Sequence, residues 1–162
     1  MTHTKAIVLA MLLTLPQVAA AQHRYVSYTD LTTDFNPSVL TIEPSANRVL
    51  VGHASRSAEF CTQSSFRCVE SGSFSFAVPS EGLGVGSEWK FRRDEYQVTA
   101  EVFFEVLGVR CSCFLIRRKK DGSLFYYSRE RGLLAFALRS SEHEGRDVFI
   151  SVAANGYLAD SK

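Results

Sequence analysis

Hydrophobic and polar residues alternate along most of this chain, and that pattern predicts strands. Short alternating or β-branched segments bounded by turn residues are typical of antiparallel sheets. In the first half we expect strands at Arg24–Tyr28, Val39–Ile42, Arg48–Val51 and Ser73–Val78. The intervening Gly52–Ser73 is polar and rich in serine, so we interpret it as a long loop or irregular strand pinned by cysteines. Pro79–Gly86 contains three glycines and is expected to be a flexible connection.

The segment Trp89–Leu107 is compatible with two structures. As a strand it would place hydrophobic side chains on one face, namely Tyr96, Val98, Ala100, Val102, Phe104 and Val106. As a helix it would be capped by Ser87 and ended by Gly108, with a stripe made by Tyr96, Thr99, Phe103 and Val106. The clean alternation and the β-branched content favour the strand.

The clearest local signal is a hairpin in the second half. Phe114–Ile116 and Leu124–Tyr127 flank the turn Lys120–Ser123, whose Asp-Gly pair tolerates the positive φ of tight turns. A second turn at Arg129–Gly132 precedes Leu133–Leu138, and Asp147–Ala153 forms a last strand. We therefore predict a mostly β protein, an antiparallel meander that forms a small sandwich or barrel stapled by disulfides.

The N-terminus has the three parts of a secretory signal peptide. A basic start ends at Lys5, an apolar run covers Ala6–Leu15, and small residues follow at Val18–Ala21. As a helix the apolar run spans only about 15 Å, too short for a permanent membrane anchor. We expect residues 1–21 to be a cleavable signal peptide and residues 22–162 to be a single β-rich domain without an integral membrane anchor. The protein is then periplasmic or secreted, and the style of the signal suggests bacterial export.

Charge is balanced overall but uneven along the chain. The whole sequence has 18 basic and 17 acidic residues, and removal of Lys5 with the signal leaves a neutral chain. Neutrality and export argue against a nucleic-acid partner. Between Arg110 and Arg139, however, basic residues exceed acidic ones, either as a solvated hairpin or as a docking face for an acidic partner. The expected partner-binding residues are Arg117, Arg118, Lys119, Tyr126, Arg129 and Arg131.

The chain contains four cysteines, Cys61, Cys68, Cys111 and Cys113. Export favours two disulfides. On a strand Cys111 and Cys113 would be about 6 to 7 Å apart, so we prefer to pair each with Cys61 or Cys68 rather than with the other. One alternative joins Cys61 to Cys68 and leaves Cys111-Ser112-Cys113 as a redox dithiol; another binds zinc with all four thiolates.

No catalytic or metal-binding set is predicted, and no cofactor. The histidines His23, His53 and His143 lack a nucleophile motif, and Glu142–Glu144 is an isolated cluster. A copper(II) site at the mature N-terminus would require His23 to be the third residue. On a strand Glu101 and Glu105 would be about 13 Å apart, too far for a glycosidase pair.

These observations favour a non-catalytic exported binding module that acts on a protein partner, as an inhibitor, an immunity-type protein or an envelope accessory protein. The first alternative is a small-ligand carrier with an apolar cavity inside a β-barrel. The second is a thiol oxidoreductase that uses Cys111 and Cys113. Most central aromatic residues are expected in the core, while Phe103 and Tyr126 are candidates for an exposed patch with arginines.

Overall fold

The computed structural model describes residues 25–32, 38–61, 65–72, 74–139 and 145–159. The predicted signal peptide lies outside these ranges and stays a prediction. The described chain forms twelve strands and one short 3-10 turn, η1 at Pro44–Ala46. The strands are β1 Val26–Asp30, β2 Val39–Glu43, β3 Arg48–Val51, β4 Ala54–Cys61, β5 Phe66–Ser71, β6 Ser75–Pro79, β7 Glu88–Phe91, β8 Asp94–Val106, β9 Val109–Arg118, β10 Leu124–Ser128, β11 Gly132–Arg139 and β12 Arg146–Ser151.

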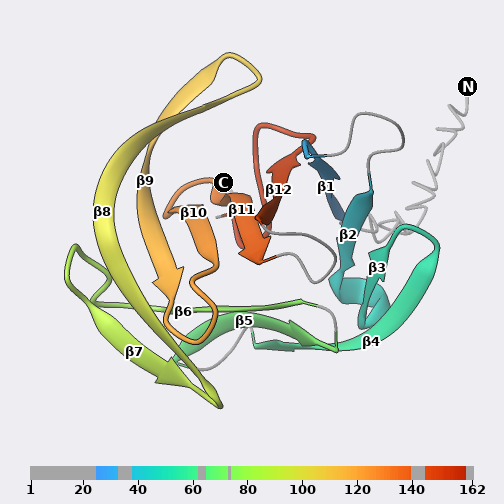
Figure 1. Ribbon diagram of the computed structural model, residues 1–162, viewed down its shortest axis with the longest axis horizontal. Coiled ribbons are helices and arrows are strands. Elements are labelled where there is room, and N and C mark those ends of the chain that lie inside the picture. Colours follow the sequence, from blue (N-terminus) through green and yellow to red (C-terminus); the bar gives the residue numbers. More distant parts are fainter. Residues whose placement is uncertain (1–24, 33–37, 62–64, 73, 140–144, 160–162) are drawn as a thin grey trace, which may run out of the picture.

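The strands make one antiparallel, nearly closed barrel-like sheet (Figure 1). Its order is β6-β5-β4-β3-β2-β1-β12-β11-β10-β9-β8-β7. Strands β1 to β6 and strands β7 to β12 are therefore two meanders, joined where the first strand pairs with the last. The predicted mostly β, antiparallel fold is confirmed, and in the described chain β6 and β7 are the terminal strands of the sheet.

Side chains close the gap between these two edge strands, which share no hydrogen-bonded ladder in the described chain. The indole Nε1 of Trp89 on β7 donates to the carbonyl of Ala77 on β6 over 3.0 Å. The rings of Phe66 and Phe91 lie 5.4 Å apart across the same gap. We call this line between β6 and β7 the seam.

Aromatic rings from opposite walls meet inside the barrel. Phe76 on β6 lies 4.8 Å from Phe125 on β10, and Phe74 lies 4.7 Å from Phe136 on β11. Phe76, Phe125 and Phe136 are completely buried. Because burial of one such side chain contributes about 1.5 to 3 kcal/mol, these rings are a major source of stability.

The segment after β12 folds back and inserts Tyr157 into the core. The amide of Leu133 on β11 donates to the carbonyl of Tyr157 over 2.7 Å, and the Tyr157 hydroxyl donates to the carbonyl of Cys68 on β5 over 2.8 Å. The hydroxyl of Tyr28 accepts from the Tyr157 amide and donates to the Leu133 carbonyl. Burial raises the pKa of both tyrosines, so both hydroxyls stay protonated donors. Tyr157 thus ties two distant strands together.

The interpretation of Gly52–Ser73 as a long loop or irregular strand is wrong for most of its length. It forms the regular strands β4 and β5, whose ladder pairs Cys61 with Cys68. The first four residues of β4 are all exposed, so the strand lacks the alternation by which sequence patterns reveal a half-buried strand.

Trp89–Leu107 forms strands, as preferred, but its hydrophobic residues do not share one face. The ladder pairs Val98 with Ile116 and then Ala100 with Leu115, so the register shifts at Thr99. Ile116 and Leu115 are neighbours and point to opposite faces, so a β-bulge at Thr99 reverses the faces of β8. The expectation of one continuous apolar face was wrong because a single extra residue changes the side on which every later residue lies.

This reversal creates a second hydrophobic cluster outside the barrel interior. Tyr96 and Val98 belong to the main core, whereas Val106 packs with Cys113 and Leu134. The second cluster also includes the partly buried residues Val102, Phe104, Cys111 and Ile150. It holds the distal half of the β8–β9 hairpin, which arches past the other strands (Figure 1).

Candidate functional site

The structure divides the predicted basic residues between two ends of the barrel. Arg117, Arg118 and Lys119 lie where β9 ends, whereas Arg129 and Arg131 lie beyond the opposite end of β10. The five residues of β10 separate the two groups by about 17 Å. The structure therefore does not bring the basic set together on one face.

Arg118 is part of the seam, with a side chain only 13% exposed. Its guanidinium binds both carboxylate oxygens of Asp121, lies 3.6 Å from Asp94, and donates to the Ser75 carbonyl of β6. It also lies over the ring of Phe125 at 5.7 Å. These contacts use most of its donors, so Arg118 holds β9 to the rest of the barrel.

The pKa of Asp121 makes this contact sensitive to acid. Burial opposes ionisation of Asp121, but hydrogen bonds from Arg118 and Ser123 outweigh it and lower the pKa from 3.8 to about 2. A lowered folded-state pKa adds stability above pH 4 that is lost as pH falls through 2. We expect the difference in free energy of unfolding between wild type and Asp121→Asn to shrink by about 2 kcal/mol between pH 5 and pH 2. Urea titrations of both proteins at each pH measure it, and a pH-independent difference would contradict the ion pair.

Four of the five other predicted binding residues also make internal contacts. Lys119 pairs with Glu88 over 2.7 Å. Arg129 lies 5.3 Å from the ring of Phe114 and donates to the Leu83 carbonyl, and Arg131 donates to Asn155. The ring of Tyr126 packs on that of Phe104 at 4.9 Å, beside the second cluster. Arg117 is exposed.

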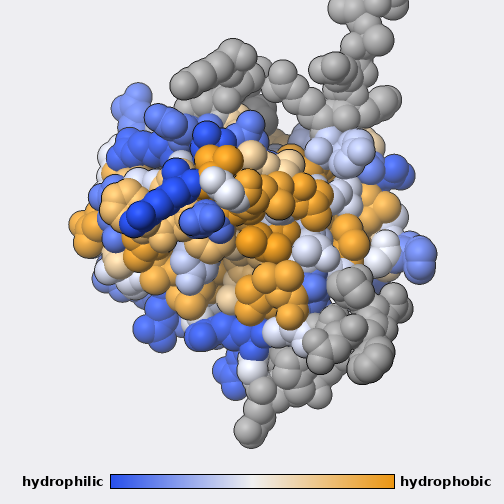
Figure 2. Space-filling view, turned by 90° about the horizontal axis from the view of Figure 1, so that it is seen from above, coloured by the Kyte–Doolittle hydropathy of each residue, from blue (hydrophilic) through white to orange (hydrophobic). Residues whose placement is uncertain are grey.

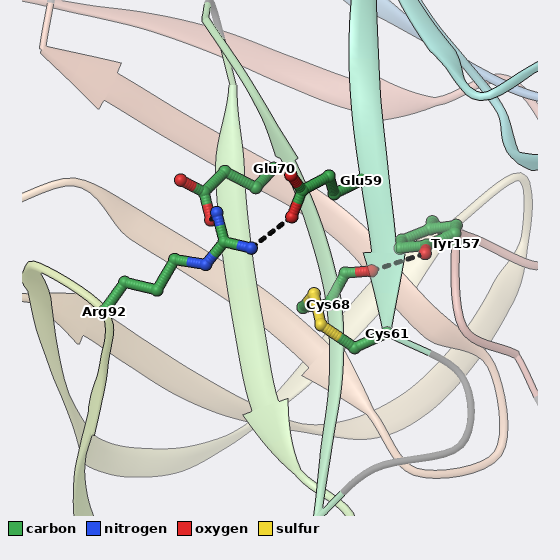
Figure 3. Close-up of a disulfide and its surroundings, with 6 residues drawn as sticks. All are labelled: Glu59, Cys61, Cys68, Glu70, Arg92 and Tyr157. Atoms are coloured by element: carbon green, nitrogen blue, oxygen red, sulfur yellow. Dashed lines mark hydrogen bonds and ion pairs between the residues drawn. A yellow bond between two sulfur atoms is a disulfide. The ribbon is translucent and has the colours of Figure 1, made fainter.

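The cysteine pairing that we preferred is wrong. Cys61 on β4 forms a disulfide with Cys68 on β5, with Cα atoms 4.8 Å apart (Figure 3). The ladder places these two residues directly opposite each other, whereas Cys111 and Cys113 carry free thiols in the second cluster. The disulfide leaves no set of four thiolates for zinc. Cross-linking a loop of this length stabilises the fold by about 2 to 3 kcal/mol.

An ion-pair triad lies near the disulfide (Figure 3). Arg92, in the turn between β7 and β8, pairs with Glu59 on β4 and with Glu70 on β5. Arg92 has a positive φ of 54°, a conformation that side chains other than glycine and asparagine rarely adopt. Its guanidinium contacts both carboxylates, so the turn between β7 and β8 is linked to β4 and β5.

A cavity of about 370 Å³ opens beside this triad. Its wall is charged and includes Glu70, Arg92, Arg93, Asp94 and Lys120. Arg92 pairs with Glu70, and Asp94 pairs with Arg118, so both acidic side chains of the wall are held in ion pairs. The cavity is best explained as the incompletely filled end of the seam.

The distal β8–β9 hairpin carries the two most exposed large hydrophobic side chains of the described residues. Phe103 is 72% exposed and Leu107, at the tip, is 66% exposed. The guanidinium of Arg110 lies 4.6 Å from the centre of the Phe103 ring. We call these three residues, Phe103, Leu107 and Arg110, the tip surface. The sequence pattern named Phe103 and missed the other two; the Leu107-Gly108 pair between two valines was the available signal for a turn.

The tip itself is a strained two-residue turn. Leu107 has a φ of 50° and Gly108 a φ of 73°, between the paired residues Val106 and Val109. Tight hairpin turns require positive φ at both central residues and favour asparagine, aspartate and glycine. A leucine there is both strained and exposed.

One edge of β8 is open near the tip. The ladder with β7 ends at Gln97, while the ladder with β9 continues to Val106. Along Thr99–Val106 the described chain supplies no strand on the side away from β9. The backbone groups of that edge can accept a further strand.

Neither a membrane helix nor a metal site emerges from the described ranges. None of their helical segments is long and apolar enough to cross a membrane. They also bring together no three side chains of His, Cys, Asp or Glu that could hold a metal ion. The cluster Glu142–Glu144 and His23 lie outside them, and His53 is exposed in the turn between β3 and β4.

Comparison of the chain with family models, with curated proteins and with solved structures gives no match. The fold and the surface geometry alone therefore support a proposal of function.

Proposed function

We propose that the protein is an exported, non-catalytic binding module that docks a protein partner through the tip surface, Phe103, Leu107 and Arg110. The observation that carries this proposal is Leu107, a 66% exposed leucine held at positive φ. Positive φ costs a bulky residue about 1 kcal/mol, and exposure forfeits the gain from burying the side chain. Asparagine would avoid both costs, so a partner that covers the side chain gives a reason for leucine.

The neighbouring residues have the composition of a binding hot spot. Aromatic residues and arginine dominate the energy of protein interfaces, because a flat ring and a planar guanidinium bury large areas at low entropic cost. Phe103 and Arg110 already stack on each other, so the pair is partly preorganised. Seen from above, the side toward which the tip projects, hydrophobic residues gather in a wide area bordered by charged ones (Figure 2).

The open edge of β8 favours a polypeptide as the partner. A strand added along Thr99–Val106 would satisfy the backbone groups of that edge. Glu101 and Glu105 point to the same face as Phe103, and such charges discourage unspecific pairing between copies of the protein. Glu101 and Glu105 line that edge, and Arg110 already lies directly opposite Glu105, so a partner segment with basic groups beside its hydrophobic residues fits best.

The small-ligand carrier receives less support. A carrier requires an internal cavity with apolar walls. In the described part of the barrel, rings from opposite walls are in direct contact, as Phe76 with Phe125 and Phe74 with Phe136.

The substitution Leu107→Asn tests whether Leu107 serves partner binding rather than the stability of the fold. The variant should be as stable as wild type or more stable by up to about 1 kcal/mol, because asparagine tolerates positive φ. It should lose partner affinity by at least about 30-fold, the effect of removing a hot-spot residue. The partner is first captured from the source organism's envelope and secreted fractions, then purified for calorimetry with each variant.

The matched control is Val85→Ser, which replaces another aliphatic side chain of similar exposure, 61%, in the connection between β6 and β7. Its affinity should equal that of wild type. Capture of no protein, or an equal affinity for wild type and Leu107→Asn, would overturn the proposal.

A further inference from the structure

We propose that Cys111 and Cys113 form a thiol–disulfide exchange site, in which Cys111 attacks accessible disulfides and Cys113 completes the exchange. The two Sγ atoms lie 3.7 Å apart on the same face of β9. Closing this distance to the length of a disulfide bond, about 2 Å, requires rotation of the two side chains and a local distortion of β9. The inference does not depend on the proposed protein partner.

The two thiols differ in their surroundings, which sets their roles. Cys111 is half-buried, and its Sγ lies 3.7 Å from the Phe104 carbonyl. Cys113 is buried among Val106 and Leu134, out of reach of a substrate. Only Cys111 is placed to meet an incoming disulfide, and only Cys113 is placed to reach Cys111 from inside the protein.

The exchange balances with a disulfide, RSSR, as the oxidant. The Cys111 thiolate bonds to one sulfur of RSSR, the S–S bond breaks, and one thiolate leaves and takes up a proton. The Cys113 thiol then loses its proton, its sulfur bonds to the Cys111 sulfur, and the second RS⁻ leaves. Two protein thiols are oxidised to one disulfide and RSSR is reduced to two RSH. The same steps in reverse reduce the protein.

The second step should be slow at neutral pH. Burial, together with the neighbouring Cys111, raises the pKa of the Cys113 thiol to about 12. Below that pKa the thiolate fraction rises about tenfold per pH unit, so ring closure should accelerate with pH. A mixed disulfide on Cys111 is therefore an observable intermediate.

The product should be easier to reduce than the disulfide of β4 and β5. Residues two apart on a strand have Cα atoms about 6.6 Å apart, near the upper limit for disulfides, whereas those of Cys61 and Cys68 lie 4.8 Å apart. A bond that distorts its strand returns readily to two thiols. Such a bond suits exchange rather than permanent cross-linking.

Differential alkylation of the purified protein in glutathione buffers tests the proposal. With increasing oxidised glutathione, peptide mass spectrometry should show Cys111 and Cys113 joining to each other, at a more oxidising ratio than Cys61 and Cys68. In Cys113→Ala the reaction should stop at a stable glutathione adduct on Cys111. In Cys111→Ala the thiol at Cys113 should stay unmodified.

If either variant fails to fold, the time course of the wild-type protein tests the proposal. The mixed disulfide should appear first and convert faster at pH 9 than at pH 7. A glutathione adduct that persists on Cys111 at both pH values, or faster modification of Cys113 than of Cys111, would overturn the proposal.

Discussion

Replacing Gly156 with alanine should destabilise the protein by more than about 3 kcal/mol, and unfolding by urea measures the loss. A Cβ at this position would overlap the backbone carbonyl of Leu133. Backbone atoms cannot rotate away as a flexible side chain can, so the C-terminal segment would have to leave its place. Its departure would break the backbone hydrogen bond between Leu133 and Tyr157 and expose the Tyr157 ring.

Gly84→Ala is the matched control for this prediction. Gly84 has an ordinary φ, and an added Cβ would meet only the Ser87 hydroxyl at 3.9 Å. Its stability should stay within about 0.5 kcal/mol of wild type. If Gly156→Ala were equally mild, the C-terminal segment would not pack against β11 as described.

Replacing Arg118 with alanine should lower the free energy of unfolding by about 3 to 5 kcal/mol. The change leaves the carboxylates of Asp94 and Asp121 without their guanidinium and removes the contact with Phe125. Loss of one partner of a buried ion pair is costly because the remaining charge is poorly solvated. Lysine at this position, in Arg118→Lys, should restore less than half of the stability that Arg118→Ala loses. An ammonium group cannot bind Asp121 through two nitrogens.

Arg117→Ala provides the comparison, because Arg117 is adjacent and exposed on the opposite face of β9. Arg117→Ala should change the free energy of unfolding by less than about 0.5 kcal/mol. Equal effects of the two substitutions in urea titrations would show that Arg118 is solvated rather than built into the seam.

The fold class was predictable because alternation reports directly on which face of a strand is buried. The hairpin around Asp121-Gly122 and the last strands follow that rule, and both are present. The rule fails for β4, whose first four residues are exposed and supply no contrast. It also fails at Thr99, because a bulge leaves no mark on the hydrophobic pattern.

The candidate surfaces were harder to predict because sequence shows charge but not its neighbours. Arg118 and Arg129 belong to a basic segment, yet one is held by Asp121 and the other by the Leu83 carbonyl and the Phe114 ring. Leu107 was assigned to the end of a hydrophobic strand. Only the register of β8 with β9 shows that it occupies the turn.

The cysteine pairing depended on a strand that the sequence pattern did not reveal. With Gly52–Ser73 taken as a loop, Cys61 and Cys68 have no fixed separation. Once β4 and β5 form a ladder, the two residues face each other and pair. The spacing rule that argued against joining Cys111 to Cys113 describes a strained bond, and strain is what an exchangeable disulfide requires.

Site-specific photo-crosslinking in the source organism tests the central claim most directly. A photoreactive residue replaces Glu105, which is exposed between Phe103 and Leu107, or replaces Val85 as the control. We predict one covalent adduct with a protein of defined mass at position 105, absent at position 85 and lost when Phe103→Ser is added. No adduct at position 105, or equal adducts at both positions, would contradict docking through the tip surface.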